Sequence, residues 1–353
     1  MHTLRLAVDP LDLTSPASAA SLRQAAEILR NGGTVALPTE TVYGLGANAL
    51  NPNAVAKIFA AKQRPSWDPL IVHISDISML RLVVSAIPPA AEKLMSAFWP
   101  GPLTLLLPKC DTVPDAVTAG RARVGVRMPQ HPVASALIRE AGIPIAAPSA
   151  NRFGRTSPTT AEHVLEDLDG SIDAVLDSGE TTHGLESTVV DACENPCVVY
   201  RPGVVTVEQM RGIGVEVAMF RETAQTTNAA PESLPSPGVG LRHYAPKAKL
   251  ILIEGEGETQ RAAFLRVGGE NLERGEKVGW MQPEDFPEHA EKQRAVFYRW
   301  GRWNNAEELA QRLFAGLRFL DKAGATVIVC PLPSATGIGA AMRDRLLKAA
   351  RRN

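Results

Sequence analysis

The sequence predicts an α/β fold in two domains, on the basis of its length, its pattern of elements and one polar segment. The chain has 353 residues, which is more than a single hydrophobic core usually sustains. Short β-prone runs alternate with helical segments in both halves, as they do in α/β folds. Between the halves, residues 223–240 (TAQTTNAAPESLPSPGVG) are polar and rich in Pro, Ser and Thr, which is typical of a linker.

The first half predicts a mixed sheet with intervening helices. Residues 17–31 place apolar side chains at helical spacing, and Gly32-Gly33 follow where a helix ends. A strand at 34–38 leads into a loop, TETVYGLGANAL, and then into a helix at 54–64. Further strands are predicted at 70–74, 103–108, 124–128, 143–147, 174–178 and 187–192, and the domain is expected to end at about residue 205.

The second half predicts a smaller, three-layer α/β domain. After HYAPKAK, strands at 250–254, 278–282 and 295–300 are followed by a helix from Ala306 to Leu320, a strand at 325–330 and a C-terminal helix through 340–350. We therefore expect domains at 1–205 and 248–353, with residues 206–247 between them as a linker.

Composition excludes several classes of protein. Apolar residues make up 45% and charged residues 21% of the chain, as in ordinary globular proteins. The net charge of -1 provides no overall field for nucleic acid, so an RNA contact requires a local basic surface. Cys110, Cys193, Cys197 and Cys330 lack zinc-like spacing and are expected to be free thiols. Because no apolar run approaches the roughly 20 residues that span a bilayer, we expect a cytoplasmic protein without membrane contact.

Familiar nucleotide-binding and hydrolase motifs are missing from the sequence. The chain has no Walker A signature, and neither GIGAAM nor GVGLRH completes the GxGxxG fingerprint. The G-x-S-x-G elbow of serine hydrolases is absent as well. What remains is a set of polar residues at the ends of apolar strands, where open α/β sheets gather their ligands.

Two early segments carry candidate ligand groups. PTETVYGLG, residues 38–46, offers hydroxyls, a carboxylate and two glycines after one strand, or it is only a β-turn with capping residues. In AKQRPSWDPLIVHI, Lys62 and Arg64 end a helix, and this pair suits a polyphosphate but also complements a helix dipole. His73, inside an apolar strand, is either a core residue or a catalytic group.

Two later segments add further candidates. Arg123 and Arg127 are four residues apart on one strand, so both side chains project to the same face and line either an anion-binding cleft or a solvated surface. In AAPSANRFGRTSPTTAEHV, two alanines precede Ser149 and Asn151 and leave the backbone close to a ligand. These two residues and Ser157 have a second interpretation as residues that shape turns.

Together these segments resemble the threonylcarbamoyl-AMP synthase family, the YrdC-like proteins, in the long form with an added C-terminal domain. The resemblance spans nearly the whole chain and rests on NGGTVALPTETVYGLG, IFAAKQRP, PLIVHI, WPGPLT, VRMP, HP, PIAAPSAN, SPT, GLESTVVD, RPG and HYAP, all in the family's order. It implies a twisted mixed sheet with a concave basic cleft, plus a smaller Rossmann-like C-terminal domain.

The resemblance also implies an activity. The family joins L-threonine, bicarbonate and ATP, with Mg²⁺ accompanying the ATP, into L-threonylcarbamoyladenylate and releases pyrophosphate, which is a nucleotidyltransferase reaction. A separate transferase, contacted only transiently, then uses the product to modify the adenosine next to the anticodon of tRNA. A direct contact with tRNA is left open, and no metal ligands are assigned.

The family's functional residues fall on named positions of this chain. The resemblance implies that four residues hold the triphosphate and its metal ion and are catalytic: Lys62, Arg64, Ser149 and Asn151. It implies ATP contacts from Arg64, Asp68, Arg123, Ser149, Ser157, Arg201 and Tyr244. It implies threonine contacts from Thr41, His73, Arg127, Ala147 and Ser187, with Arg127 as the partner of the carboxylate.

Two of these positions depart from the family. Asp68 stands where relatives carry an uncharged Asn, and a carboxylate repels phosphate unless it faces the metal or solvent. Arg123 lies where relatives can have a small polar residue, so its ATP contact is expected through either backbone or side chain. The HYAP segment, with Tyr244, is expected to fold over the cleft as a lid that shields the intermediate from water.

Two other functions remain open from the sequence. A basic cleft also suits an RNA-binding accessory factor, for which salt-sensitive RNA binding without ATP turnover would be the sign. The same fold can also host a carbamoyl or acyl adenylate synthase that uses another amine. Pyrophosphate release measured across amino acids separates that second alternative from a threonine enzyme.

Overall fold

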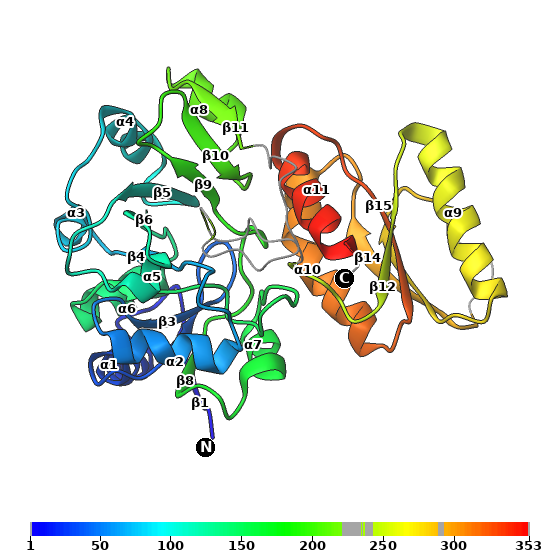
Figure 1. Cartoon of the computed structure of the whole chain (residues 1–353). Coiled ribbons are helices and arrows are strands. Elements are labelled where there is room, and N and C mark those ends of the chain that lie inside the picture. Colours follow the sequence, from blue (N-terminus) through cyan, green and yellow to red (C-terminus); the bar gives the residue numbers. More distant parts are fainter. Residues whose placement is uncertain (1, 221–233, 235, 237–242, 289–292, 352–353) are drawn as a thin grey trace. The chain divides into compact units, whose positions relative to one another are not determined.

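The computed structural model describes residues 2–220, 234, 236, 243–288 and 293–351. The chain divides into two compact units, which Figure 1 draws mainly in blue to green and in yellow to red. The first contains Met1–Phe153, Pro158–Thr182 and Glu186–Gly240. The second contains Leu241–Asn353 together with two short segments from the first half of the sequence, Gly154–Ser157 and His183–Leu185.

A mixed sheet forms the centre of the first unit and has eleven strands within the described part of the chain. For example, β4 (Ile71–His73) runs parallel to β6 (Arg123–Arg127), whereas β2 (Val35–Leu37) is antiparallel to β3 (Gly44–Asn48). The order is β1 (Leu4–Ala7), β8 (Ala174–Asp177), β2, β3, β7 (Ile145–Ala146), β4, β6, β5 (Leu103–Pro108), β9 (Thr188–Asp191), β10 (Cys197–Arg201) and β11 (Val217–Met219). Its helices are α1 (Pro16–Arg30), α2 (Pro52–Lys62), α3 (Ile77–Leu80), α4 (Pro89–Phe98), α5 (Asp115–Thr118), α6 (Pro132–Ala141), α7 (Ala161–Leu168) and α8 (Val207–Gly212).

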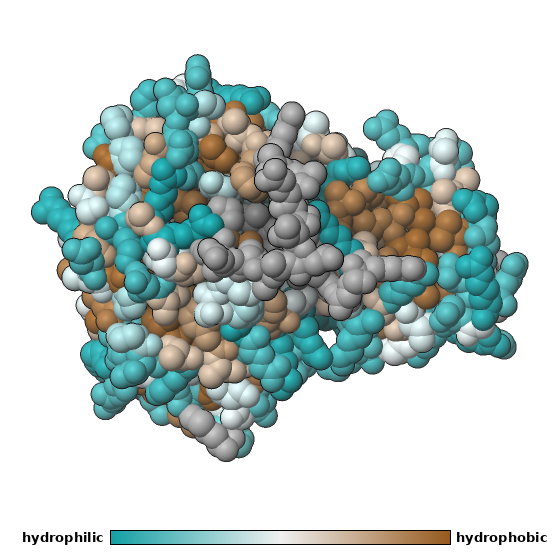
Figure 2. Space-filling model, viewed as in Figure 1, coloured by the Kyte–Doolittle hydropathy of each residue, from teal (hydrophilic) through white to brown (hydrophobic). Residues whose placement is uncertain are grey.

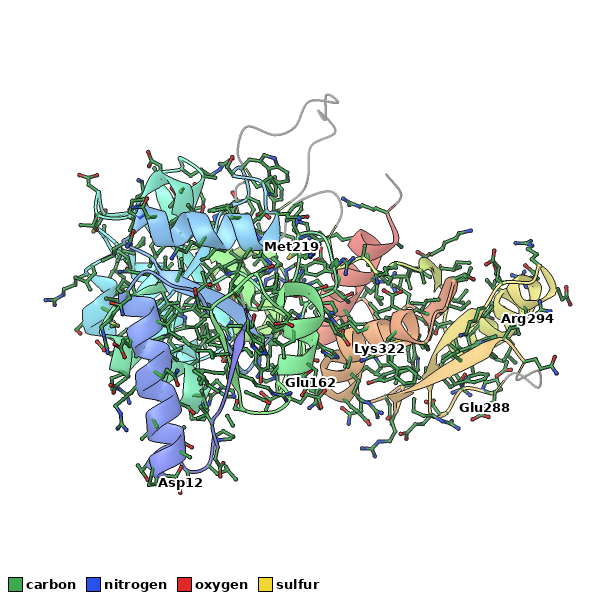
Figure 3. All side chains as sticks on the ribbon, turned by 90° about the horizontal axis from the view of Figure 1, so that it is seen from below. Asp12, Glu162, Met219, Glu288, Arg294 and Lys322 are labelled. Carbon is green, nitrogen blue, oxygen red and sulfur yellow. The ribbon has the colours of Figure 1, made fainter. Side chains whose placement is uncertain are left out.

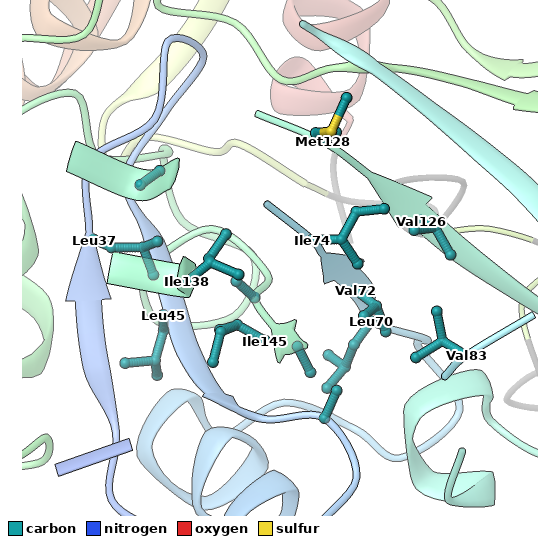
Figure 4. Packing of buried hydrophobic residues seen from close by; sticks show 14 of the residues in the cluster. Leu37, Leu45, Leu70, Val72, Ile74, Val83, Val126, Met128, Ile138 and Ile145 are labelled. Atoms are coloured by element: carbon teal, nitrogen blue, oxygen red, sulfur yellow. The ribbon is translucent and has the colours of Figure 1, made fainter. Parts of the chain in front are cut away.

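The strands of this sheet are held by a continuous apolar core. Figure 4 shows side chains from five neighbouring strands packing together, among them Leu37, Leu45, Val72, Val126 and Ile145. All five are fully buried. Each such side chain stabilises the fold by about 1.5–3 kcal/mol when it leaves water.

Helix α1 begins and ends close to where the sequence predicts. The side chain of Ser15 accepts a hydrogen bond from the backbone N–H of Ser18, Pro16 lies in the first turn, and Gly32 adopts a φ of 76° just past the end. The apolar face that the spacing predicts is buried against the rest of the unit. The prediction of this helix is therefore confirmed.

One predicted loop is a strand. The segment TETVYGLGANAL was expected to be a loop, but Gly44–Asn48 forms β3 and pairs with β2 and β7. Glycine has low β propensity, so the sequence does not show the strand. At Gly46 an added Cβ would lie 2.8 Å from side-chain atoms of both Ile145 and Leu37, so the neighbouring strands pack directly onto the glycine.

The second unit has a parallel sheet of its own. Its strand order is β12 (Lys249–Ile253), β15 (Val327–Pro331), β13 (Val278–Pro283) and β14 (Ala295–Gly301). In Figure 1, α9 (Gly257–Glu273) lies on one side of this sheet, and α10 (Ala306–Lys322) and α11 (Gly337–Ala350) lie on the other. The prediction of a mixed-sheet α/β domain plus a smaller α/β domain is confirmed.

A close contact between a helix and the sheet organises the core of the second unit. The rings of Phe264 in α9 and Trp280 in β13 meet edge to face with centroids 5.0 Å apart. Gly268, one turn further along α9, sits over the indole, and an added Cβ there would lie 1.9 Å from the ring of Trp280. The helix can therefore approach this large side chain only because position 268 carries no side chain.

Charged and apolar residues are unevenly distributed at the surface. Figure 3 shows Asp12, Glu162, Glu288 and Lys322 extending away from the ribbon, and all four are exposed. In Figure 2 hydrophobic side chains are visible on the second unit, where Figure 1 draws β12 and β15, and the apolar residues of these two strands are buried or half-buried. None of the described helices combines the length and the apolar composition that are needed to cross a membrane.

Part of the predicted linker, residues 206–247, has regular structure. Both α8 and β11 lie within it and belong to the first unit. The expectation of an extended linker otherwise falls largely on residues 221–233, 235 and 237–242, which lie outside the described residues. The HYAP segment, residues 243–246, belongs to the second unit, and its closure as a lid stays a prediction.

Candidate active site

Lys62 ties the end of α2 to the loop that follows β7. The helix stops at Lys62 because Gln63 adopts a left-handed backbone with φ of 53°. Lys62 is 1% exposed, and its ammonium donates hydrogen bonds to the carbonyl oxygens of Ser149 and Asn151. Three of the four residues predicted to hold the triphosphate are therefore in direct contact.

Arg64 and Asp68 form a buried ion pair beside Lys62. The Arg64 guanidinium lies 2.9 Å from the Asp68 carboxylate and also donates to the carbonyls of Asp68, at 3.1 Å, and Pro69, at 2.7 Å. Burial raises the pKa of the Asp68 carboxyl, and the positive charges of Arg64, Lys62 and Arg201 oppose that shift. Three cations thus act on one buried carboxylate.

Arg201 reaches this cluster from β10 and holds Ser187 in place. Its guanidinium donates to the Ser187 carbonyl at 3.0 Å and to the Ser187 hydroxyl at 3.1 Å. That hydroxyl also lies 2.8 Å from the hydroxyl of Thr104 in β5. At Gly203 an added Cβ would lie 2.4 Å from the backbone nitrogen of Thr188, so only glycine lets the two segments pass this closely.

Thr41, His73 and Arg127 form a second cluster in the same unit. His73 and Arg127 are register partners in the parallel strands β4 and β6, which places their side chains on the same face. Arg127 is 3% exposed and donates to the Thr41 hydroxyl at 2.8 Å and to the carbonyl of Gly101 at 3.2 Å. Ala147 is held nearby by a 2.8 Å bond from its N–H to the carbonyl of Ile71, two residues before His73.

Glu40 belongs to this second cluster and was not predicted. Its carboxylate lies 2.6 Å from Nη2 of Arg127, and both side chains are buried. Burial opposes ionisation of Glu40, but Arg127 and nearby backbone N–H groups outweigh it and hold the pKa of Glu40 below its ordinary value. The sequence shows only that Glu40 is a carboxylate between two threonines just after a predicted strand. Nothing in the sequence indicates that this carboxylate pairs with Arg127.

His73 remains neutral in the folded protein. Burial, followed by the charge of Arg127, lowers the pKa of His73 from 6.5 to about 3. Between these pH values the unfolded chain binds a proton that the folded protein does not, so the free energy of unfolding falls as the pH falls through this window.

We expect His73→Asn to make the free energy of unfolding less dependent on pH between pH 6.5 and about 3, because the proton that unfolding takes up is removed with the imidazole. Urea unfolding of both proteins across this window measures the effect. Equal pH slopes for variant and wild type would contradict the assignment.

The structure does not bring Arg123 to either cluster. Although Arg123 and Arg127 project to the same face as predicted, the rise of four residues along β6 places their backbones about 13 Å apart. The Arg123 guanidinium pairs instead with Asp191 and Glu194, the latter at 2.7 Å. Carboxylates thus engage Arg123 at the far end of β6, and the ATP contact expected of it stays a prediction.

Ser157 and Tyr244 belong to the second unit. The ring of Tyr244 stacks on Phe314 with centroids 5.6 Å apart, and the guanidinium of Arg345 lies 5.4 Å from the same ring. The ATP contacts expected of Ser157 and Tyr244 stay predictions. Within the described residues, no three His, Cys, Asp or Glu side chains gather as a metal-binding group.

Taken together, the first unit holds two charged, buried groups of different chemistry. One contains Lys62, Arg64 and Arg201, and suits the several oxygens of a polyphosphate. The other contains Arg127 with hydroxyl, imidazole and carboxylate neighbours, and suits a small polar molecule that carries a carboxylate. The loop from Ala147 to Asn151 passes from one group to the other.

Two family models match the chain. A model described as Telomere recombination, for the Sua5, YciO and YrdC proteins, matches residues 27–203. A second, described as the C-terminal domain of threonylcarbamoyl-AMP synthase, matches residues 205–351. The two matches follow each other along the chain with a single residue between them.

Individual relatives agree with these models over nearly full length. The threonylcarbamoyl-AMP synthase of Bacillus subtilis is 44% identical over 352 residues, which cover 99% of this chain and 98% of the relative. That of Pyrococcus abyssi is 43% identical over 332 residues, or 93% of each chain. A crystal structure of P. abyssi Sua5 complexed with L-threonine has a TM-score of 0.89 at 40% identity, and the match covers 99% of this chain and 98% of that one.

Proposed function

Because the chain belongs to the threonylcarbamoyl-AMP synthase family, we propose that it makes L-threonylcarbamoyladenylate from L-threonine, bicarbonate and ATP and releases pyrophosphate. The observation that carries the proposal is a group of three buried cations: Arg64 pairs with Asp68 at 2.9 Å, and Lys62 and Arg201 lie close enough to act on the same carboxylate. A triphosphate is the substrate group that needs such a cluster, because its charge is spread over several oxygens.

The proposed chemistry needs no protein nucleophile. The α-ammonium group of threonine releases its proton to solvent, the resulting neutral amine attacks bicarbonate, water leaves, and an N-carboxylate forms. An oxygen of that carboxylate then attacks the α-phosphorus of ATP, and pyrophosphate leaves. Positioning and charge stabilisation would supply most of the catalysis, with Lys62 and Arg64 stabilising the charge that builds on the leaving group.

Mg²⁺ is proposed to enter with ATP. This ion is usually held by phosphate oxygens and water with few protein ligands, so no dense carboxylate group is needed. The hydroxyl of Ser149 and the amide oxygen of Asn151 are hard oxygen donors of the kind that fit it. Bound there, Mg²⁺ would neutralise part of the phosphate charge.

Threonine is proposed to bind at the second cluster, with its carboxylate on Arg127. The guanidinium donates hydrogen bonds to Gly101 and Thr41, and its Nη2, 2.6 Å from the Glu40 carboxylate, makes no hydrogen bond within the described residues. The threonine complex of the P. abyssi relative supports this substrate. Thr41, His73, Ala147 and Ser187 are proposed to complete the site.

The product is proposed to serve the threonylcarbamoyl modification of the adenosine next to the anticodon of tRNA. A separate transferase would take the adenylate from this enzyme in a transient contact. The near-zero net charge does not favour tight binding of the tRNA itself.

The direct test of the proposal is pyrophosphate release by the purified protein with ATP, Mg²⁺ and bicarbonate. We expect release to require both L-threonine and bicarbonate. L-serine should be the amino acid that the site excludes least well, because recognition of one methyl group discriminates by only about 1–3 kcal/mol. Release that is indifferent to the amino acid would favour another adenylate synthase. No release, together with salt-sensitive RNA binding, would favour the RNA-binding alternative.

A further inference from the structure

The Glu40–Arg127 ion pair is buried to a degree that calls for an explanation. Their side chains are only 6% and 4% exposed, and the charged atoms are 2.6 Å apart. A buried ion pair is weak evidence for stability, because removing two charges from water costs about as much as their attraction returns. Two apolar side chains would fill the same space without that cost, which suggests that the charges serve the site.

The groups around the pair can form hydrogen bonds but do not cancel its charges. The Thr41 hydroxyl lies 2.8 Å from Nη1 of Arg127, and the backbone N–H of Gln130 faces the Glu40 carboxylate. The two histidines nearby both have lowered pKa values: burial and then Arg127 act on His73, and burial acts on His131 although Glu40 opposes it. The ionised groups that act on His73 are Arg127 and Glu40 themselves.

We infer that Glu40 binds the α-ammonium group of L-threonine while Arg127 binds its α-carboxylate. This inference rests on the proposed function. It adds Glu40 to the threonine site and explains why the site would accept only ligands that carry an amine. A zwitterionic amino acid carries one charge of each sign a few ångströms apart, as the pair does. When it enters between Glu40 and Arg127, each buried charge keeps a partner and the net charge of the site does not change.

A ligand with only a carboxylate would be selected against. It would take Arg127 as its partner and leave the carboxylate of Glu40 buried and uncompensated, which is strongly unfavourable. A site that pairs a polar group in this way rejects analogues lacking it far more strongly than an apolar pocket does. Glu40 would thus restrict the site to amino acids before any chemistry takes place.

A purely structural role for Glu40 makes a different prediction. If Glu40 only held Arg127 in position, its loss would weaken every ligand whose carboxylate binds Arg127, with or without an amine. If Glu40 binds the ammonium, its loss would weaken only the amine-bearing ligand. The two roles are separated by comparing L-threonine with (R)-3-hydroxybutyrate, which lacks the amine but keeps the carboxylate, the hydroxyl and the methyl.

Calorimetric titration of both ligands into the full-length protein without ATP is the test. For Glu40→Gln we expect the Kd of L-threonine to rise on the order of 100-fold, while the Kd of (R)-3-hydroxybutyrate stays unchanged or falls. Asp173→Asn is the matched control: its carboxylate holds the backbone N–H of Thr34 at 2.8 Å, at the end of β2 away from Glu40, so neither Kd should change.

Each other outcome has a distinct meaning. Equal weakening of both ligands in Glu40→Gln, or unchanged threonine binding, would overturn the ammonium role but leave the proposed function standing. Absence of threonine binding by the wild type would count against the proposed function itself. If Glu40→Gln does not fold, Glu40→Asp, which withdraws the charge by one methylene, should still weaken L-threonine more than (R)-3-hydroxybutyrate, and equal weakening would overturn the inference.

Discussion

Arg64→Ala is expected to reduce the rate of pyrophosphate release on the order of 100- to 1,000-fold, as does the loss of other groups that stabilise developing charge. The guanidinium is one of the three cations that act on the buried Asp68 carboxylate, where the phosphates are proposed to bind. Lys62→Ala should reduce the rate to a similar extent, because the ammonium of Lys62 also holds the carbonyl groups of Ser149 and Asn151 in position. A coupled assay of pyrophosphate in the presence of L-threonine measures both.

Two controls separate lost chemistry from lost folding. Arg64→Ala alone leaves the buried Asp68 carboxylate without its 2.9 Å partner, which destabilises proteins by about 3–5 kcal/mol. The double variant Arg64→Ala/Asp68→Asn should recover most of that stability but none of the activity. Lys57→Ala removes an exposed lysine from the same helix as Lys62 and should leave activity unchanged. Near-normal turnover in folded Arg64→Ala or Lys62→Ala would refute the role of these cations.

Gly268→Ala is expected to destabilise the second unit by about 1–3 kcal/mol or more, because the added methyl group overpacks a filled core. Its Cβ would lie 1.9 Å from the ring of Trp280, and the indole is fully buried between the sheet and α9. Urea unfolding followed by tryptophan fluorescence should show a lower midpoint than the wild type.

The matched control for this substitution is Gly212→Ala at the end of α8. An added Cβ there has no atom within 4 Å, so the same methyl group meets open space. We expect no loss of stability in this variant, since alanine is a better helix residue than glycine. If Gly268→Ala unfolds at the same urea concentration as the wild type, the core around Trp280 is looser than its geometry indicates.

Much of the fold could be predicted from the sequence because burial leaves a periodic pattern. The strand at 103–108 and the helix at 17–31 were found from apolar spacing alone, and the structure has them at Leu103–Pro108 and Pro16–Arg30. Strand β3 was missed because its glycines are selected by the close approach of neighbouring strands, which is a tertiary effect. The family assignment, made from short motifs in order, is confirmed by the family models.

The site was less predictable because its contacts join residues that are far apart in sequence. Glu40 and Arg127 form an ion pair although they are 87 positions apart in the sequence, and no local pattern indicates that contact. Arg123 illustrates the reverse: its strand spacing correctly indicated the face, but the carboxylates of Asp191 and Glu194 engage it at the other end of β6. Which cation meets a substrate and which meets a neighbouring carboxylate is decided by tertiary packing.

The composition of the second unit bears on how this chain can diversify. The short segments Gly154–Ser157 and His183–Leu185 are encoded within the first half but belong to the second unit, where Arg318 donates to the carbonyl of Thr156 at 2.6 Å. At Gly184 an added Cβ would lie 2.3 Å from the carbonyl oxygen of Gln311. Recombination that exchanged the C-terminal half between homologous genes would keep these two loops from one parent and take α10 from the other. The loops would then pack against a helix of different sequence. Their sequences should therefore coevolve with α10 rather than with the residues that flank them.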